Sequence, residues 1–220
     1  MIDFLIELFF PPKCHFCQKL LERGETDLCH KCRKEAPVFS TPKRNFQLIA
    51  QWTAVWYYRG NVKDSIRRFK FYNARSYADF FGKAIAMKLQ EDPFRNNFDI
   101  LTWVPVSPLR RFTRGYDQAE LLAQALGREL SMTPVPGLVK QRHTKPQSSI
   151  HDRTLRRANV FNAYRGINPT LFNGKRVLLV DDVVTTGSTA SECAKMLLVS
   201  GATHIYLAAV AAATNEKTSR

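Results

Sequence analysis

The sequence predicts an α/β protein, a parallel sheet flanked by helices, with a small zinc-binding module in front of it. Two observations predict the sheet: an apolar run over 177–180 that suits a strand covered on both faces, and strand–loop–helix patterns that begin at 99 and at 177. A third, two C-x-x-C pairs near the start, predicts the module. We expect the N-terminal helix and module in residues 1–40 and the α/β domain in residues 41–220.

Composition sets the class of the protein. With 220 residues and 45% hydrophobic residues, the chain can build one α/β core with a small appendage. Residues 1–10 are apolar but contain Asp3 and Glu7, and they are too short to span a bilayer, so we expect a short docking helix there. Because no other apolar run reaches membrane length, a soluble, cytoplasmic protein without membrane insertion is expected.

The two C-x-x-C pairs are spaced like the knuckles of a zinc site. They supply four thiolates, which complete a tetrahedral site and leave zinc a structural role. A disulfide pair is the alternative, but the two-residue spacing and a cytoplasmic setting favour metal. The neighbouring His15 and His30 are expected to flank the ligands, and Cys193 to pack in the core. The predicted ligands are Cys14, Cys17, Cys29 and Cys32.

The first half of the α/β domain alternates strands and helices. Periodicity predicts strands over 52–58 and 99–104 and helices over 61–72, 76–89 and 118–130.

The positive charge is concentrated in two blocks. The net charge is +14, and residues 41–80 hold eight Lys or Arg against two Asp, while residues 141–175 hold seven against one. Such blocks indicate a polyanionic partner, with nucleic acid the leading candidate, although a solvated basic surface is the alternative. Aromatic residues lie among the cations of 67–77, which suits stacking on unpaired bases, but core packing explains at least half of them equally well. The candidate nucleic-acid residues are Arg67, Arg68, Lys70, Arg75, Arg153, Arg156 and Arg157.

The strand over 99–104 leads into a polar loop that contains three arginines. Arg110, Arg111 and Arg114 could together neutralise a pyrophosphate, because planar guanidinium groups bind such oxygens well. A basic surface loop without a ligand is the alternative. Farther on, residues 141–157 are polar and basic without periodicity, so a mobile loop is expected there.

The strongest functional signal follows the strand over 177–180. Asp181 and Asp182 offer acceptors for a cis-diol or for magnesium-bound waters at the carboxyl end of that strand. A small hydroxyl-rich turn and a helical pattern over 190–198 come next, and free amides at the helix start would bind a phosphate. A capped helix without a ligand is the alternative. The turn residues are Thr185, Thr186, Gly187, Ser188 and Thr189.

Residues 177–189 resemble the phosphoribosyl pyrophosphate motif of type I phosphoribosyltransferases at every position. The resemblance implies a type I phosphoribosyltransferase-like fold, with Asp181 and Asp182 at the ribose hydroxyls and as the catalytic acids, and with residues 185–189 at the 5-phosphate. It also implies that the three-arginine loop holds the pyrophosphate with magnesium, and that residues 141–157 form a hood that closes over the substrate.

Over nearly the whole length, the order of parts resembles the ComF family of competence proteins and its relatives in gluconate use. The carriers are the two cysteine knuckles, the loop over 104–119, the stretch over 147–164 and the motif over 177–189. That family usually has Asn where this chain has Asp117, an acid that would repel pyrophosphate unless magnesium intervenes.

The ComF resemblance implies a part in natural transformation, with incoming single-stranded DNA and other competence proteins as partners. The leading hypothesis is a DNA-binding competence protein that keeps a phosphoribosyl pyrophosphate site. The alternative is an active phosphoribosyltransferase that transfers ribose 5-phosphate to a base or nucleotide. The sequence shows no base-recognition pattern that would identify this acceptor.

Overall fold

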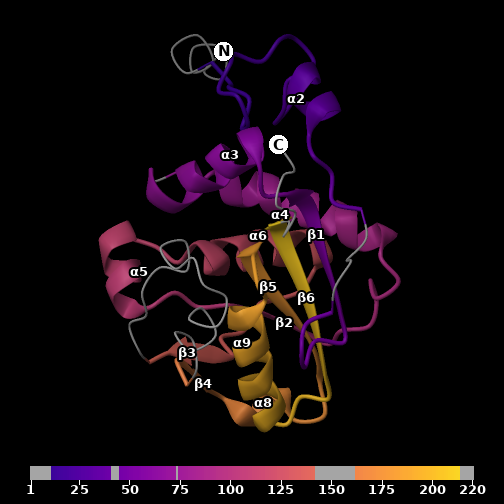
Figure 1. Ribbon diagram of the computed structural model, residues 1–220, viewed down its shortest axis with the longest axis vertical. Helices are drawn as coiled ribbons and strands as arrows, with labels where there is room; N and C mark the ends of the chain where they lie inside the picture. Colours follow the sequence, from indigo (N-terminus) through magenta and orange to yellow (C-terminus); the bar gives the residue numbers. More distant parts are fainter. Residues whose placement is uncertain (1–10, 41–44, 73, 142–161, 214–220) are drawn as a thin grey trace, which may run out of the picture.

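A four-stranded parallel sheet forms the centre of the molecule (Figure 1). The computed structural model describes residues 11–40, 45–72, 74–141 and 162–213. The strand order is β1-β6-β5-β2, and all three neighbouring pairs are parallel. The strands are β1 (Gln51–Tyr57), β2 (Ile100–Trp103), β5 (Arg176–Val184) and β6 (His204–Ala212).

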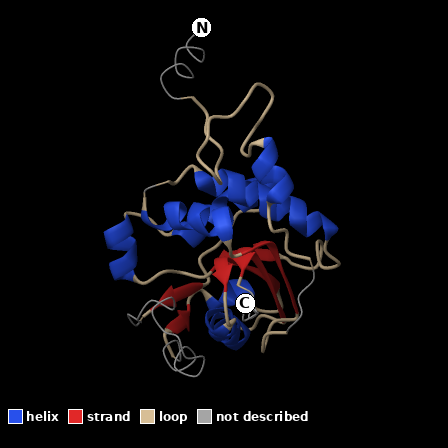
Figure 2. Ribbon diagram, turned by 45° about the horizontal axis from the view of Figure 1, so that its top comes forward, coloured by secondary structure: helices blue, strands red, loops and turns tan. Residues whose placement is uncertain are grey.

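Helices cover both faces of this sheet, as Figure 2 shows from a second direction. One face carries α3 (Gly60–Phe71), α4 (Tyr77–Glu91) and α6 (Gln118–Leu130). The other carries α9 (Ser188–Val199) with a small antiparallel pair, β3 (Leu138–Lys140) and β4 (Tyr164–Gly166). The remaining helices are short: α2 (His30–Glu35), α5 (Pro108–Arg114) and α8 (Pro169–Phe172).

The central strand β5 is apolar on both faces because each face has its own core. Leu178 and Val180 pack in the cluster under α4 and α6, whereas Val177 and Leu179 pack in the cluster under α9. All four side chains are fully buried. The alternation follows from the two-residue period of a strand. This architecture confirms the predicted parallel sheet flanked by helices.

Two boundaries differ from the sequence predictions. The region expected to be an irregular arginine loop contains α5, because Ser107 caps its start, Pro108 follows the cap and Gly115 ends it in the left-handed conformation at φ 74°. The strand expected over 177–180 continues to Val184, because β6 keeps pairing with it beyond the point where β2 ends.

The antiparallel pair β3–β4 escaped prediction because each strand has only three residues, too few for a periodic signal. The expected elements at residues 1–10 and 142–157 lie outside the described residues. None of the helices that the structure describes combines the length and the apolar composition needed to cross a bilayer.

The cysteine-rich module packs on the α3–α4 side of the domain and shares its core. Cys14, Phe16 and Cys32 belong to the same buried cluster as Trp56 and Phe80. The Phe16 ring meets Trp56 edge to face at 5.2 Å between centroids. Burial of these aromatic surfaces fixes the module on the helical layer.

Candidate functional site

The four cysteines of the module converge on one point. Their sulfur atoms all lie within 4.8 Å of one another, and Sγ of Cys17 is 3.7 Å from Sγ of Cys29. In a tetrahedral zinc site with Zn–S bonds of about 2.3 Å, the sulfur atoms lie about 4 Å apart. The spacing of the four thiols is therefore compatible with a zinc ion between them. Cys14 and Cys32 are buried, which suits a closed structural site. His15 and His30 are not among these ligands.

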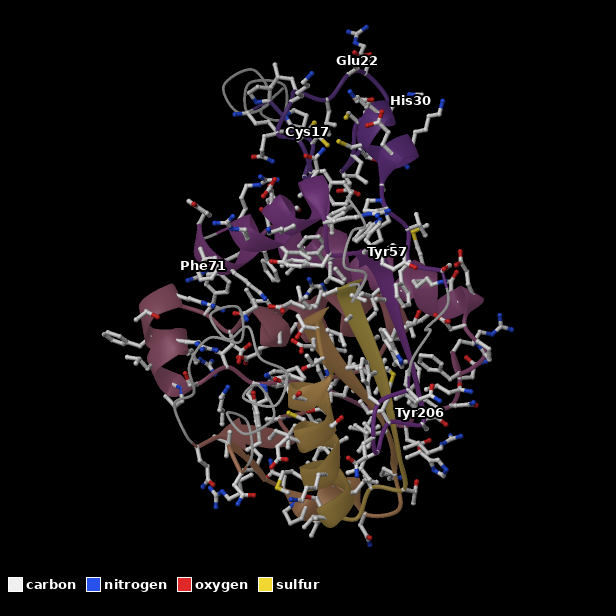
Figure 3. All side chains as sticks on the ribbon, in the orientation of Figure 1. Cys17, Glu22, His30, Tyr57, Phe71 and Tyr206 are labelled. Atoms are coloured by element: carbon white, nitrogen blue, oxygen red, sulfur yellow. The ribbon has the colours of Figure 1, made fainter. Side chains whose placement is uncertain are left out.

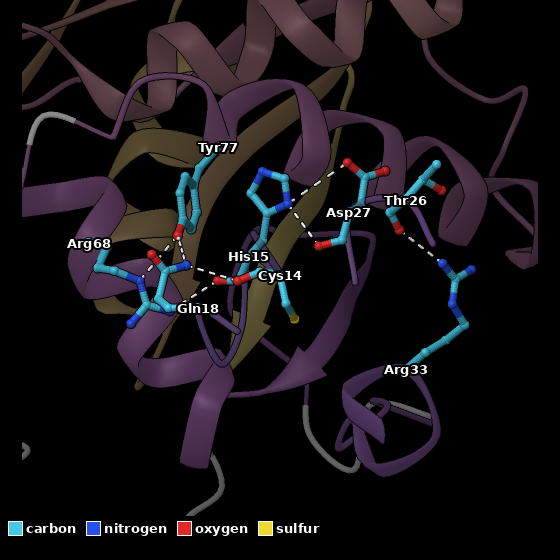
Figure 4. Close-up of polar contacts among 8 residues, drawn as sticks. All are labelled: Cys14, His15, Gln18, Thr26, Asp27, Arg33, Arg68 and Tyr77. Carbon is cyan, nitrogen blue, oxygen red and sulfur yellow. Dashed lines mark hydrogen bonds and ion pairs between the residues drawn. The ribbon is translucent and has the colours of Figure 1, made fainter. Parts of the chain in front are cut away.

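Arg68 joins this module to the helical layer, as Figure 4 shows. Its Nη2 donates to the carbonyl oxygens of His15 (3.0 Å) and Phe16 (2.6 Å), and its Nε donates to the hydroxyl of Tyr77 (3.2 Å). The His15 ring stacks on Phe80 at 4.7 Å between centroids. The Arg68 guanidinium, one of the predicted nucleic-acid residues, is therefore engaged in holding the module.

Asp181 and Asp182 are neighbours in β5, beyond the last β2 pairing at Val180. Because side chains alternate along a strand, their carboxylates face opposite sides of the sheet. Oδ1 of Asp182 forms an ion pair with Nζ of Lys70 on α3 at 2.8 Å. Oδ2 of Asp182 is buried and has no hydrogen-bond partner within the part of the chain that the structure describes. Lys70, also predicted to contact nucleic acid, thus reaches the acid pair.

Asp181 faces the α9 side, and its Oδ1 accepts the backbone N–H of Asp182 at 2.8 Å. The carboxylate keeps some surface exposure, but it lies deep among protein atoms. This burial, followed by the charge of Asp182, raises the pKa of Asp181 to about 8. The two carboxylates therefore lie on opposite sides of β5, just beyond the last residue of β5 that pairs with β2.

The hydroxyl-rich turn connects β5 to α9. Gly187 stands just before the helix at φ 77°, and a Cβ atom there would lie 2.2 Å from the Phe46 ring. Only glycine fits this position, since both the backbone conformation and the space exclude a side chain. The hydroxyls of Thr186 and Ser188 are 2.8 Å apart, and Thr185 through Thr189 are half-buried apart from the buried Gly187. The turn thus presents hydroxyls at the positive end of α9.

The three arginines of α5 do not share one position. Arg111 pairs with Glu120 at 3.2 Å, and Arg114 donates to Oε1 of Gln118 at 2.7 Å while lying 4.7 Å from the Phe71 ring centroid. Arg110 is half-buried, and burial, followed by the charge of Arg114, lowers its pKa. The charges of Arg110 and Asp181 both act on the buried Tyr164 hydroxyl.

Asp117 is the N-cap of α6. Its Oδ1 accepts from the N–H groups of Ala119 (2.9 Å) and Glu120 (3.2 Å), and its Oδ2 accepts from that of Val106 (2.8 Å). The side chain is buried, and this burial raises its pKa. Three backbone donors engage the carboxylate, so Asp117 ties the segment after β2 to α6.

The end of α3 lies near α5, where the Arg114 guanidinium approaches the Phe71 ring, which is labelled in Figure 3. Exposed aromatic side chains occur at the end of α3 and on α5. The exposed fractions are 62% for Phe71, 71% for Tyr72 and 87% for Phe112. Arg67 of α3 and Arg111 of α5 are exposed as well. We call these five residues the α3–α5 face. Phe112 was missed in the sequence because an isolated apolar residue in a basic stretch carries no stacking signal.

The other candidates for nucleic-acid contact are placed differently. Phe69 and Tyr77 are buried in the core, as expected for part of the aromatic set. Arg75 donates to the carbonyl oxygen of Gly115 at 3.1 Å and lies over the Tyr116 ring at 5.1 Å from its centroid. Three candidates lie outside the described residues: Arg153, Arg156 and Arg157.

Two family models match the chain. A double zinc ribbon domain covers residues 5–43, and a phosphoribosyl transferase domain covers residues 113–220. The second match includes the acid pair and the hydroxyl-rich turn, and the first includes all four cysteines. Both predicted parts of the chain thus have an independent counterpart among known families.

Curated relatives extend over most of the length. The chain is 29% identical to "Competence protein F" of Haemophilus influenzae, over 90% of this chain and 96% of that protein. It is 28% identical to "DNA utilization protein YhgH" of Escherichia coli O157:H7, over 91% and 96%. A solved "allosteric regulatory enzyme of purine biosynthesis" aligns at 24% identity and a TM-score of 0.43, over 62% of this chain and 26% of that one.

Proposed function

The chain belongs to the ComF family of competence and DNA utilization proteins, and on that premise we propose that it binds single-stranded DNA and carries a phosphoribosyl pyrophosphate site. Two observations support the proposed DNA binding: the relatives are competence and DNA utilization proteins, and the α3–α5 face is exposed. The match to a phosphoribosyl transferase domain and the acid pair support the proposed binding of the sugar donor, phosphoribosyl pyrophosphate. We place the protein in the cytoplasm, and we place the domain boundary near residue 40.

The observation that carries the DNA-binding proposal is the exposure of three aromatic rings at the end of α3 and on α5, two helices that also carry exposed arginines. Aromatic rings normally avoid water, and here Phe71, Tyr72 and Phe112 are more than half exposed. Unpaired bases stack on such rings, while guanidinium groups contact the phosphates. In duplex DNA the flat faces of the bases are stacked on one another and are not available to these rings. The geometry therefore favours single strands.

Fluorescence anisotropy with a labelled single-stranded oligonucleotide tests this half. We expect salt-sensitive binding, and a loss of at least about tenfold in affinity for a Phe71→Ala, Phe112→Ala double variant, because each stacked base contributes about 1–3 kcal/mol. The matched control is Met87→Ala with Val199→Ala, which removes two apolar side chains of similar exposure elsewhere. Equal losses in both double variants would exclude the α3–α5 face as the binding surface.

The sugar-donor half assigns a role to each part of the sheet edge. Asp181 and Asp182 accept hydrogen bonds from the ribose hydroxyls. Oδ2 of Asp182 is buried and has no hydrogen-bond donor among the described residues, so a ribose hydroxyl could supply one. The hydroxyl-rich turn and the start of α9 bind the 5-phosphate. Magnesium accompanies the pyrophosphate and neutralises part of its charge. We expect an Asp181→Asn, Asp182→Asn double variant to lose affinity for the sugar donor, measured by calorimetry. Its affinity for the oligonucleotide should stay intact.

The two halves share one element, α3. Its last turn carries Phe71 of the α3–α5 face, and Lys70 beside it pairs with Asp182. The Tyr116 hydroxyl also donates to the carbonyl oxygen of Phe69. A ligand that shifts α3 therefore acts on both sites, so the oligonucleotide should change donor affinity, and the donor should change oligonucleotide affinity by the same factor.

Active phosphoribosyl transfer is the second candidate, and the position of Asp117 favours it. The acid that departs from the usual Asn is engaged by three backbone N–H groups, so it caps α6 instead of facing a ligand. Transfer would release pyrophosphate when a base or nucleotide attacks the sugar. Pyrophosphate release over a panel of such acceptors tests it. If no acceptor in the panel causes pyrophosphate release while the donor still binds, the protein binds the donor without transferring the sugar.

A further inference from the structure

Helix α3 contacts both cysteine pairs of the module. Near its start, Nδ2 of Asn61 donates to Sγ of Cys32 in the second C-x-x-C pair at 3.8 Å. Near its end, Nη2 of Arg68 donates to the carbonyl oxygens of His15 and Phe16 in the first pair. Asn61 and Arg68 are about two turns apart, so they project from the same side of α3. The helix therefore joins the two cysteine pairs from outside the metal site.

The opposite side of α3 reaches the acid pair. Nζ of Lys70 forms an ion pair with Oδ1 of the buried Asp182 at 2.8 Å. Lys70 follows Arg68 by two residues, which is about 200° around the helix axis, so the two cations leave α3 in nearly opposite directions. Figure 1 shows α3 between the module and the carboxyl end of β5. The last turns of α3 thus hold the module on one side and Asp182 on the other.

The module is the part of this arrangement that has two states. A small module built around four thiols folds when its metal binds and unfolds when the metal leaves. On unfolding, the half-buried Arg68 guanidinium loses the two carbonyl oxygens to which it donates. Helix α3 itself stays in place, because Val62, Ile66 and Phe69 are fully buried in the domain core. The expected consequence is a looser last turn of α3, the turn that carries Lys70.

We propose that Arg68 is a positioning residue through which zinc binding in the module strengthens binding of the sugar donor at the acid pair. This inference rests on the proposed donor site and adds its regulation by the module. With the module folded, Arg68 fixes the last turn of α3 and Lys70 holds Oδ1 of Asp182. Oδ2, which has no partner among the described residues, then faces the ribose hydroxyls in a fixed position. By linkage, the donor raises the affinity for zinc by the same factor.

Two equilibrium titrations on the full-length protein, in magnesium buffer under reducing conditions, test the proposal. Calorimetry measures the affinity for phosphoribosyl pyrophosphate before and after a zinc-selective chelator removes the metal. Competition with a chromogenic chelator measures the affinity for zinc with and without the donor. We expect each ligand to raise the affinity for the other by about fivefold or more, the lower end of typical couplings between sites. The Asp181→Asn, Asp182→Asn double variant controls for direct chelation of zinc by the donor, because added donor should leave its zinc affinity unchanged.

Three single variants test the role of Arg68. Arg68→Met removes the guanidinium, so the factor by which zinc and donor affect each other should fall toward one. Asn61→Ala removes the donor to Cys32 and should weaken zinc binding about tenfold, as for other residues that support metal ligands, but it should keep that factor because Arg68 remains. Lys63→Met, at an exposed position of the same helix, is the matched control and should behave as the wild type.

The outcomes distinguish this inference from the proposed donor site. If the zinc-bound wild type does not bind phosphoribosyl pyrophosphate, the donor site fails and this inference fails with it. If the wild type binds the donor equally well with and without zinc, the donor site stands and the inference alone is overturned. A full coupling factor in Arg68→Met would overturn the role of Arg68. If Arg68→Met no longer binds zinc, the two wild-type titrations still decide whether the sites are coupled.

Discussion

The zinc module and the sheet-edge site are assembled in opposite ways. The four thiols come from one short stretch, Cys14 to Cys32, and meet because two knuckles fold back on each other. The sheet-edge site combines Lys70 of α3, the acid pair of β5 and the hydroxyl-rich turn before α9, which come from both faces of the sheet. Spacing alone therefore specifies the first site, whereas the topology of the whole domain specifies the second.

This difference predicts how each region fails. The module has little core of its own and depends on one ion, so losing a ligand should remove it entirely. The sheet-edge site is built on strands that two cores hold in place, so losing one charge should cost stability without removing the fold. Four substitutions test this contrast, in order of expected size.

Cys32→Ser should have the largest effect. Three thiolates bind zinc far more weakly than four, and the module should unfold and expose Phe16 and Trp56. Metal content by mass spectrometry and tryptophan emission measure this. Cys193→Ser, a buried cysteine outside the module, should keep a full zinc complement. Stoichiometric zinc in Cys32→Ser would show that the module is not organised around these four ligands.

Lys70→Met should destabilise the domain by about 3–5 kcal/mol, since it leaves the buried Asp182 carboxylate without its partner. Urea unfolding measures the effect. Adding Asp182→Asn should recover part of the loss, because the buried charge is then gone. Lys63→Met, on an exposed position of the same helix, serves as control. A Lys70→Met protein as stable as this control would mean that the ion pair contributes nothing.

Asp117→Asn should cost about 1–2 kcal/mol, a typical value for a helix cap. The amide oxygen can still accept from Ala119 and Glu120, but the amide nitrogen cannot accept from Val106. Thermal unfolding measures the loss, with the exposed Asp79→Asn as control. A gain in stability would show that the carboxylate is poorly placed.

Asp99→Asn should have the smallest effect, about 1 kcal/mol or less, because both partners of its ion pair with Arg176 are partly exposed. Hydrogen bonds from Arg176 lower the pKa of Asp99 to about 2. A lowered carboxyl pKa stabilises the fold above pH 4, and this contribution disappears as the pH falls toward 2. Unfolding free energies of the two proteins should therefore converge at low pH. A constant difference would rule out a charge effect.

Much of the fold was predictable because its signals are local. The apolar run over 177–180 is buried on both faces, and helices predicted over 61–72, 76–89 and 118–130 lie within two residues of α3, α4 and α6. The start and stop signals of α5, Ser107-Pro108 and Gly115, were also present in the sequence. They were hidden in a polar stretch that reads equally well as a loop.

The candidate site was less predictable because the type of a residue does not reveal where its side chain points in the folded protein. Arg68 and Lys70 stand two residues apart in one basic helix, and the sequence treats both as nucleic-acid contacts. In the structure Arg68 turns to the carbonyls of the zinc module and Lys70 to Asp182.

The sequence by itself determined the sheet strand, the hydroxyl-rich turn and the four zinc ligands, because each depends on neighbours in the chain. Only the tertiary structure decided which cations reach the acid pair and which aromatic rings stay in water. Those choices depend on where α3 and α5 come to lie around β5. Packing of distant segments sets these positions, and no spacing within one segment records them.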